Sequence, residues 1–185
     1  MKRSFSVFFS SALIGVALAA LSAQAQVVPS ATARQFSITA GALGSAFQPD
    51  YTSDGGVQSN PDYLFGVGAY VDLRFTRWIQ IEGEGHWMHI NPNLNFNESS
   101  YLGGFRVPVR RFGRFTPYGK VLYGLGTASF LSGRASDLAL GGGVDYRLTK
   151  KISIRAADFE YQRWRTKPTT LTPYGFSVGI GYKVF

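Results

Sequence analysis

The sequence has no cysteine among its 185 residues. The chain therefore cannot form a disulfide, and it cannot carry a lipid anchor on a cysteine. Acidic residues and histidines are also few: 11 Asp and Glu stand against 19 Lys and Arg, with two His and a formal net charge of +8. A chain this basic can bind nucleic acid or an anionic lipid surface, and its first residues help to separate these two possibilities.

The first 25 residues have the pattern of an export signal. Lys2 and Arg3 supply a charged start, residues 7–21 an apolar core, and residues 23–25 (Ala-Gln-Ala) a small-x-small cleavage site. We therefore expect a signal peptide over residues 1–25 that is removed, which lowers the net charge from +8 to +6 because two basic residues are lost. Export makes nucleic acid a poor partner and anionic lipid headgroups a better one.

After residue 25 the sequence lacks any apolar run near the ~20 residues that a membrane helix needs. Residues 26–34 are expected to be a flexible lead-in, and residues 35–185 a single domain. Apolar and polar residues alternate in this domain, most clearly in 174–185, where every second residue from Tyr174 to Val184 is apolar or aromatic. Such alternation predicts a strand with two different faces, and strands can cross a membrane only as a closed barrel.

The same alternation predicts eight strands joined by connections of alternating length. The predicted strands are residues 36–43, 64–75, 79–90, 101–110, 116–127, 138–148, 152–164 and 174–185. The short connections are 76–77, 111–114 and 149–150, and the longer ones are 44–63, 91–98, 129–136 and 165–172. Short turns at one rim and longer loops at the other are typical of an outer-membrane barrel, in which the short-turn rim is periplasmic.

The seventh predicted strand changes phase. Ile154 faces one way, yet Phe159 needs the same face although it lies an odd number of residues further on. One extra residue at 156–157, a β-bulge, restores the register and turns Arg155 and Asp158 to the other face together.

Glycines and aromatic residues indicate which face is inside. Glycines accompany the charged face, which suits a narrow lumen and brings no advantage to a strand exposed to water. Aromatic residues gather near the strand ends, as two interfacial girdles require. We expect Phe75 and Trp78 at one rim, and Trp87, Tyr101, Trp164 and Tyr174 at the other. The sequence thus predicts an all-β, eight-stranded, antiparallel, up-and-down transmembrane β-barrel.

Four segments carry a resemblance to a known family. They are P-Y-G-K (117–120), G-G-G-V-D-Y-R-L (141–148), A-D-F-E-Y-Q-R-W (157–164) and G-I-G-Y-K-V-F (179–185). With them the chain resembles the bacterial outer-membrane β-barrel domain family, in particular its small eight-stranded OmpA/OmpX-like members. The resemblance implies the bacterial outer membrane as location, outer-membrane lipids as surroundings, and insertion by the barrel-assembly machinery. It also implies an insertion signal in the last strand, at Tyr182 and Phe185, although Phe185 is one residue out of phase with Tyr182.

The alternation turns eleven charged residues toward the lumen. They are Asp72, Arg74, Glu82, Glu84, Arg106, Lys120, Asp145, Arg147, Arg155, Asp158 and Glu160. One interpretation is an ion or proton path, and the other is a plug. An eight-stranded barrel has an interior just wide enough for its own side chains, and buried charges must pair there. The sequence therefore favours a plugged, charge-paired lumen.

Metal binding and catalysis are less favoured. His86 and His89 face opposite sides of their strand, which is poor geometry for a metal. His86 and Glu84 with Ser99 or Ser100 would imitate the Ser-His-carboxylate set of lipid A acylases and deacylases, but no H-x-S follows either histidine. We expect no catalytic residue, cofactor or metal.

The predicted function is that of a structural or interaction barrel. Its loops 44–63 and 165–172 are the expected contacts for a surface partner. A lipid-modifying enzyme and a narrow ion channel are the alternatives.

Overall fold

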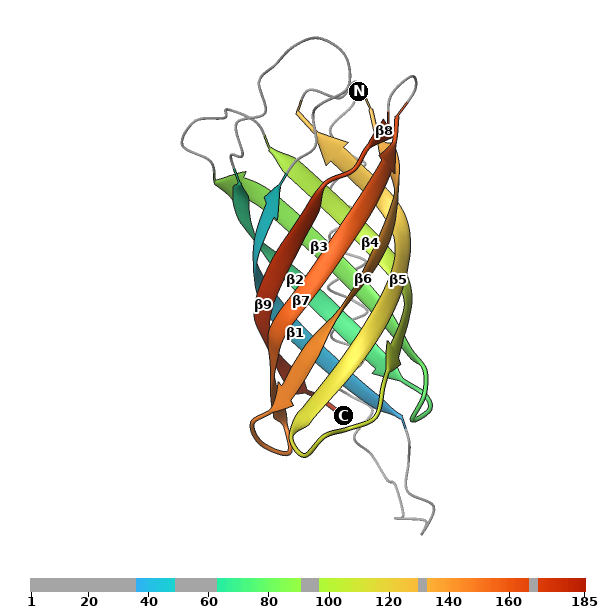
Figure 1. The fold of residues 1–185 in the computed structure, drawn as a ribbon, viewed down its shortest axis with the longest axis vertical. Helices are drawn as coiled ribbons and strands as arrows, with labels where there is room; N and C mark the ends of the chain where they lie inside the picture. Colours follow the sequence, from blue (N-terminus) through green and yellow to red (C-terminus); the bar gives the residue numbers. More distant parts are fainter. Residues whose placement is uncertain (1–35, 49–62, 91–96, 130–132, 167–169) are drawn as a thin grey trace, which may run out of the picture. The chain divides into compact units, whose positions relative to one another are not determined.

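The computed structural model describes residues 36–48, 63–90, 97–129, 133–166 and 170–185, and most of them lie in antiparallel strands (Figure 1). The strands are β1 (Ser37–Gln48), β2 (Leu64–Arg74), β3 (Gln80–Ile90), β4 (Glu98–Pro108), β5 (Phe115–Ala128), β6 (Ala135–Arg147), β7 (Ile152–Arg165), β8 (Thr170–Leu171) and β9 (Tyr174–Lys183). Among these residues no helix is long and apolar enough to cross a membrane. The predicted signal peptide (1–25) and lead-in (26–34) lie outside the described residues.

The strands close into a barrel. Each strand from β1 to β7 pairs with the next, β7 also pairs with β9, and β9 pairs with β1. The two residues of β8 run along β7 beyond the end of β9, and between them Gln162 N donates to Pro173 O at 2.8 Å. β8 and β9 therefore act as one edge, and the predicted closed eight-stranded antiparallel barrel is confirmed.

Three tight turns define one rim of the barrel, which we call the short-turn rim (75–79, 109–114 and 148–151). Two of them are built alike: the Thr76 hydroxyl accepts a hydrogen bond from Ile79 N (3.0 Å), and the Thr149 hydroxyl accepts one from Ile152 N (2.9 Å). Strand β1 starts and β9 ends at the same rim (Figure 1), as predicted. In outer-membrane barrels this rim is periplasmic.

The opposite rim of the barrel, which we call the long-loop rim, differs from the prediction. Several strands extend further toward this rim than predicted. Strand β1 continues to Gln48 rather than stopping at Leu43, and β4 and β6 each start three residues earlier than predicted. The predicted loop 44–63 therefore loses residues 44–48, and the predicted loop 165–172 loses Arg165 to β7 and residues 170–171 to β8. The Gly-Ser composition of 44–45 suggests a loop, but pairing with both neighbouring strands satisfies the backbone there.

The predicted bulge in β7 is confirmed. Asp145 pairs with Arg155 and Val144 with Ala157, so Ala156 has no partner in the β6 ladder. Both alanines are exposed, whereas Arg155 and Asp158 on either side of them are buried. The extra residue therefore brings two charged side chains three positions apart into the lumen.

The outer surface is apolar along every strand. In β9, for example, Phe176, Val178 and Ile180 are each more than half exposed. At its ends this surface carries aromatic side chains: Phe75 and Trp78 are exposed at the short-turn rim, and Tyr101 and Tyr174 nearer the other. This is the face that meets lipid in an outer-membrane barrel.

Trp164, one of the six residues predicted for the aromatic girdles, is a correction. It is 2% exposed and packs inside the barrel against Ala128, Ala135 and Leu171. After the bulge, even-numbered residues of β7 point inward, so Trp164 shares the lumen face with Glu160. Gly126 provides the space, because a Cβ there would lie 2.7 Å from the Trp164 ring. Trp87, the remaining predicted girdle residue, is half-buried and donates its Nε1–H to Tyr101 Oη at 2.9 Å.

Candidate functional site: the charged lumen

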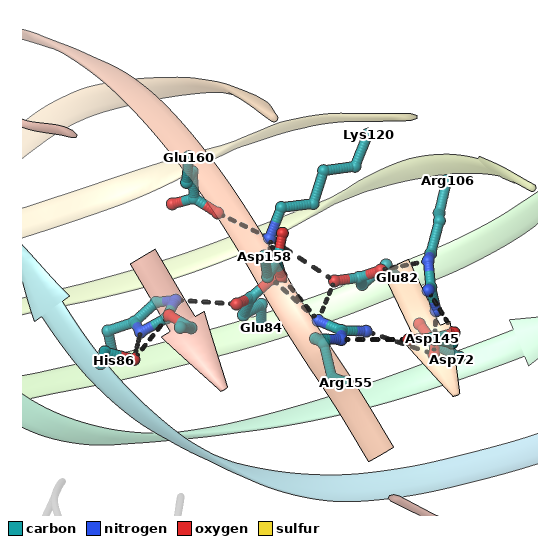
Figure 2. A network of polar contacts seen from close by, with 12 residues as sticks. Asp72, Glu82, Glu84, His86, Arg106, Lys120, Asp145, Arg155, Asp158 and Glu160 are labelled. Atoms are coloured by element: carbon teal, nitrogen blue, oxygen red, sulfur yellow. Dashed lines mark hydrogen bonds and ion pairs between the residues drawn. The ribbon is translucent and has the colours of Figure 1, made fainter. Parts of the chain in front are cut away.

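Nine of the eleven predicted lumen charges are linked by ion pairs (Figure 2). They are Asp72, Glu82, Glu84, Arg106, Lys120, Asp145, Arg155, Asp158 and Glu160. All of them are buried except Asp145, which is half-buried. We call these nine side chains, contributed by the six strands from β2 to β7, the lumen network. The other two, Arg74 and Arg147, lie at the short-turn rim, half-buried and exposed respectively.

Arg106 is the part of the network nearest the short-turn rim. Its Nη1 lies 2.6 Å from Asp72 Oδ2, and its Nη2 lies 2.5 Å from Asp145 Oδ2. The guanidinium stacks on the ring of Tyr118, 3.5 Å from its centroid. Gly143 leaves room for this ring, because a Cβ at that position would lie 2.6 Å from Tyr118 Oη. Arg106 thus joins carboxylates from two strands in a planar, oriented arrangement.

Arg155 lies deeper and forms ion pairs with five carboxylates, of which Glu84 and Asp145 are the most distant, at 3.8 and 3.9 Å. Its Nη1 is 2.9 Å from Glu82 Oε1 and 3.1 Å from Asp158 Oδ2, and its Nη2 is 3.4 Å from Asp72 Oδ2. The guanidinium lies over the ring of Tyr70, 3.8 Å from the centroid. The contact with Asp158 depends on the β7 bulge, because a regular strand would place residues three apart on opposite faces.

Lys120 is the third cation of the network. Its ammonium lies 2.8 Å from each of Glu84, Asp158 and Glu160. The carboxylates around it approach one another closely enough to hold a metal ion, and one such group also includes His86. Lys120, however, already lies where a cation would bind and supplies three donors. The arrangement therefore suits a lysine-centred cluster better than a metal centre.

His86 contacts the lumen network at Glu84, on the side of the long-loop rim. Its Nε2 contacts Glu84 Oε1 at 2.8 Å and its Nδ1 contacts the Ser45 hydroxyl at 3.1 Å, while Ser45 and Ser177 share a hydrogen bond of 2.7 Å. The sequence indicated His86 and Glu84 but not Ser45, because residues 44–63 were expected to form a loop. As predicted, His89 of the same strand points the other way and is exposed.

The lumen face changes character beyond His86. Phe47, Leu64 and Met88 form a buried apolar cluster, and Trp164 lies in a second one. Asp137, on the adjoining part of β6, is fully buried. Asp137 is not among the predicted lumen charges, because the strand was expected to start at residue 138. The alternation of Ala135, Asp137 and Ala139 is the signal that would have placed it.

The predicted insertion-signal residues lie on β9 and just after it. Tyr182 is exposed on the outer face, and Phe185 follows the strand, which ends at Lys183. Ile38 N donates to Phe185 O at 3.1 Å, and the Phe185 ring lies 6.0 Å from that of Phe36. Because residue 185 lies beyond the end of β9, the alternation of the strand does not determine the direction of the Phe185 ring. The role of both residues in assembly stays a prediction.

A closed eight-stranded barrel with an apolar outer face and a charged lumen defines the class of small outer-membrane β-barrel proteins. The chain matches the outer membrane protein beta-barrel domain family over residues 12–183 and belongs to that family. The protein is thus a membrane protein of the bacterial outer membrane.

Solved structures with the same fold include Neisserial surface protein A (NspA) and the outer membrane protein OprG of Pseudomonas aeruginosa. NspA is 16% identical with a TM-score of 0.60, and the match covers 80% of this chain and 96% of NspA. OprG is 12% identical with a TM-score of 0.51, and the match covers 80% of this chain and 95% of OprG. No curated protein matches the chain. At these identities the likeness shows the fold alone.

Proposed function

We propose that the protein is a structural or interaction barrel whose lumen is plugged by its own side chains and which performs no catalysis. The observation that carries this proposal is the lumen network, in which three cations join six carboxylates across the interior from six strands. An eight-stranded barrel has room for little more than these side chains. An ion would have to break several buried ion pairs to pass, and stranding a buried charge is costly.

The apolar side chains beyond His86 support the same proposal. Phe47, Leu64 and Met88 narrow the lumen on the β1–β3 side, and Trp164 and Leu171 do so beside β7. A permeating ion would lose part of its hydration against these apolar side chains.

Conductance in planar bilayers tests the plug. We expect no discrete current steps from the refolded wild-type barrel. Lys120→Ala combined with Arg155→Ala removes two cations from the network, and we expect leak currents from this variant. Arg163→Ala combined with Arg165→Ala, which changes exposed charges at the long-loop rim, is the matched control and should stay silent. Steady conductance steps from the wild type would support the narrow channel instead.

The long-loop rim is the proposed contact for a surface partner, through loops 44–63 and 165–172. Within these loops, residues 49–62 and 167–169 lie outside the described structure. Replacing residues 49–62 by a Gly-Ser linker of equal length should leave the heat-dependent gel shift of the barrel unchanged. It should abolish surface cross-links that wild-type cells form, and cross-links that persist in the replacement would count against this loop.

A lipid-modifying enzyme is the second candidate, because Ser45, His86 and Glu84 form a Ser-His-carboxylate chain. Two features count against catalysis. The nitrogens are exchanged relative to the usual triad, in which Nε2 faces the serine. Ser45 is also buried in the lumen, and Phe47 packs edge-on against His86 at 5.3 Å between ring centroids.

A fluorophosphonate probe separates the two candidates. We expect no labelling of the folded barrel. Labelling that disappears in Ser45→Ala but persists in Ser177→Ala would establish Ser45 as a nucleophile and favour the enzyme.

A further inference from the structure

The mouth of the barrel at the short-turn rim contains a cavity of about 180 Å³. Residues of β1 to β7 and of β9 contribute to its lining, from Ser37 of β1 to Lys183 of β9. Its floor is the Asp72–Arg106–Asp145 part of the lumen network, and its sides lead to exposed turn residues. The cavity therefore opens to the solution at this rim and is closed toward the lumen.

The sides of this cavity are strongly basic. Six cationic residues line them: Arg74, Arg111, Arg147, Lys150, Lys151 and Lys183. The only two carboxylates in the lining, Asp72 and Asp145, already pair with Arg106. Even when the whole lumen network is counted, the cavity and the network together hold nine cations and six carboxylates. The mouth thus has an excess of positive charge that the barrel itself does not balance.

Arg74 shows that this excess is not simply neutralised by neighbours. It is half-buried, and its guanidinium donates to the Gln80 amide oxygen, at 2.9 Å from Nε in the amide orientation that pairs donors with acceptors. Arg111 and Arg106 repel it, and the weaker attraction of Asp72 and Asp145, which already pair with Arg106, does not outweigh this repulsion. Among the residues that the structure describes, no carboxylate forms an ion pair with Arg74, Arg147 or Lys183. Holding like charges together in this way is costly unless an anion joins them.

We propose that this mouth binds a small multivalent oxyanion of the phosphate or diphosphate class. At about 180 Å³ the cavity is many times larger than the ~10–15 Å³ that a single water needs, so it has room for such an anion together with waters. Arginine side chains match the oxygen geometry of phosphate, and lysines add point charges. The geometry allows several cations to face one anion at once.

The position of the cavity favours an anion from solution over a lipid headgroup. Lys183 is in register with the inward-facing residues of β9, and Arg74 is in register with those of β2. Lipid acyl chains lie against the opposite, apolar face of these strands. A headgroup phosphate would have to pass over the turns to reach the cavity, whereas a soluble anion enters directly from the open side.

Calorimetric titration with inorganic diphosphate tests the proposal. The full barrel is refolded in an uncharged maltoside detergent, in buffer free of phosphate. We expect saturable binding to the wild type that weakens as salt is raised. The mouth variant Arg74→Gln/Arg147→Gln/Lys183→Gln should bind at least tenfold more weakly. The control Arg134→Gln/Arg163→Gln/Arg165→Gln makes the same change of charge at the opposite rim and should stay within twofold of the wild type.

The remaining outcomes also decide the proposal. Absence of saturable binding to the wild type, or an equal loss in both triple variants, would overturn it. If the mouth variant instead loses association with phosphatidylglycerol vesicles, and the wild type does not bind diphosphate, the site takes a lipid headgroup and the soluble-anion assignment is wrong. The heat-dependent gel shift checks folding of each variant. If the mouth variant does not fold, Lys183→Gln alone, an exposed change at a strand end, should weaken binding about threefold.

Discussion

Lys120 is the cation of the lumen network that contacts three buried carboxylates at 2.8 Å. It contacts Glu84, Asp158 and Glu160 at equal distance, whereas each of these acids has at least one further polar neighbour. Removing the lysine therefore takes from Glu160 the one cation it pairs with among the described residues, and from Asp158 the nearer of its two cations. Removing one acid leaves the lysine with two close partners. The loss of Lys120 should therefore destabilise the barrel more than the loss of one of its acidic partners.

We expect Lys120→Met to cost roughly 3–5 kcal/mol of unfolding free energy, because it leaves the buried Glu160 without a cation and weakens the pairing of Glu84 and Asp158. Glu160→Gln should cost clearly less, since Lys120 keeps Glu84 and Asp158. Equilibrium unfolding of the refolded barrel in urea measures both. Equal costs for the two variants would mean that Lys120 is not the centre of the cluster.

The tryptophans Trp164 and Trp78 lie on opposite faces of the barrel wall. The ring of Trp164 lies in the lumen, whereas Trp78 is 61% exposed on the outer face. A barrel with Trp164 as its only tryptophan (Trp78→Phe/Trp87→Phe) should resist fluorescence quenching by brominated lipids. One that keeps only Trp78 (Trp87→Phe/Trp164→Phe) should be quenched strongly. Comparable quenching of the two would place Trp164 at the lipid surface after all.

At the scale of the element, each strand separates a lipid face from a lumen face by alternation alone. Strand β6 illustrates this: Leu138 and Leu140 are exposed outside, whereas Asp137 and Ala139 are buried inside. The cost of a charge on the outer face should then depend on its depth in the bilayer. Two leucines of similar exposure allow that dependence to be measured.

Leu140 lies near the middle of β6 and is 48% exposed, and Leu148 lies in the turn after it and is 45% exposed. We expect Leu140→Arg to lower the unfolding free energy in vesicles by about 2–4 kcal/mol, and Leu148→Arg by about 0–1 kcal/mol. Because both changes replace a leucine of similar exposure by arginine, the two variants differ mainly in the depth of the new charge in the bilayer. Similar losses at both positions would contradict a membrane-spanning β6.

The whole molecule is held together by a closed ladder of backbone hydrogen bonds, with no free edge between β1 and β9. A closed barrel loses its structure cooperatively, because opening one strand exposes two edges in an apolar environment. The outer apolar surface also requires detergent or lipid. Both properties are testable on the intact protein.

We expect the refolded protein in detergent to migrate at different positions on a gel before and after boiling, because the folded barrel resists detergent at room temperature. Far-ultraviolet circular dichroism on the same samples should show loss of strand signal only after boiling. A monomer that stays dissolved in water without detergent would be incompatible with this surface.

The sequence alone determined the number of strands, the two faces and the β7 bulge. These follow from the period of two in β-strands and from the requirement that a membrane-spanning sheet closes. The phase change between Ile154 and Phe159 is visible without any tertiary information, and so is the inward direction of Lys120 and Arg155. The family resemblance likewise depends on local motifs.

Only the tertiary structure decided which inward side chains meet. Alternation assigns a face but not a height along the lumen, and the heights depend on how strands are staggered when the barrel closes. That stagger brings Lys120 of β5 to Glu84 of β3 and Glu160 of β7, and Ser45 of β1 to His86. It also decided where strands end, because pairing on both sides can extend β1 through residues whose composition is that of a loop.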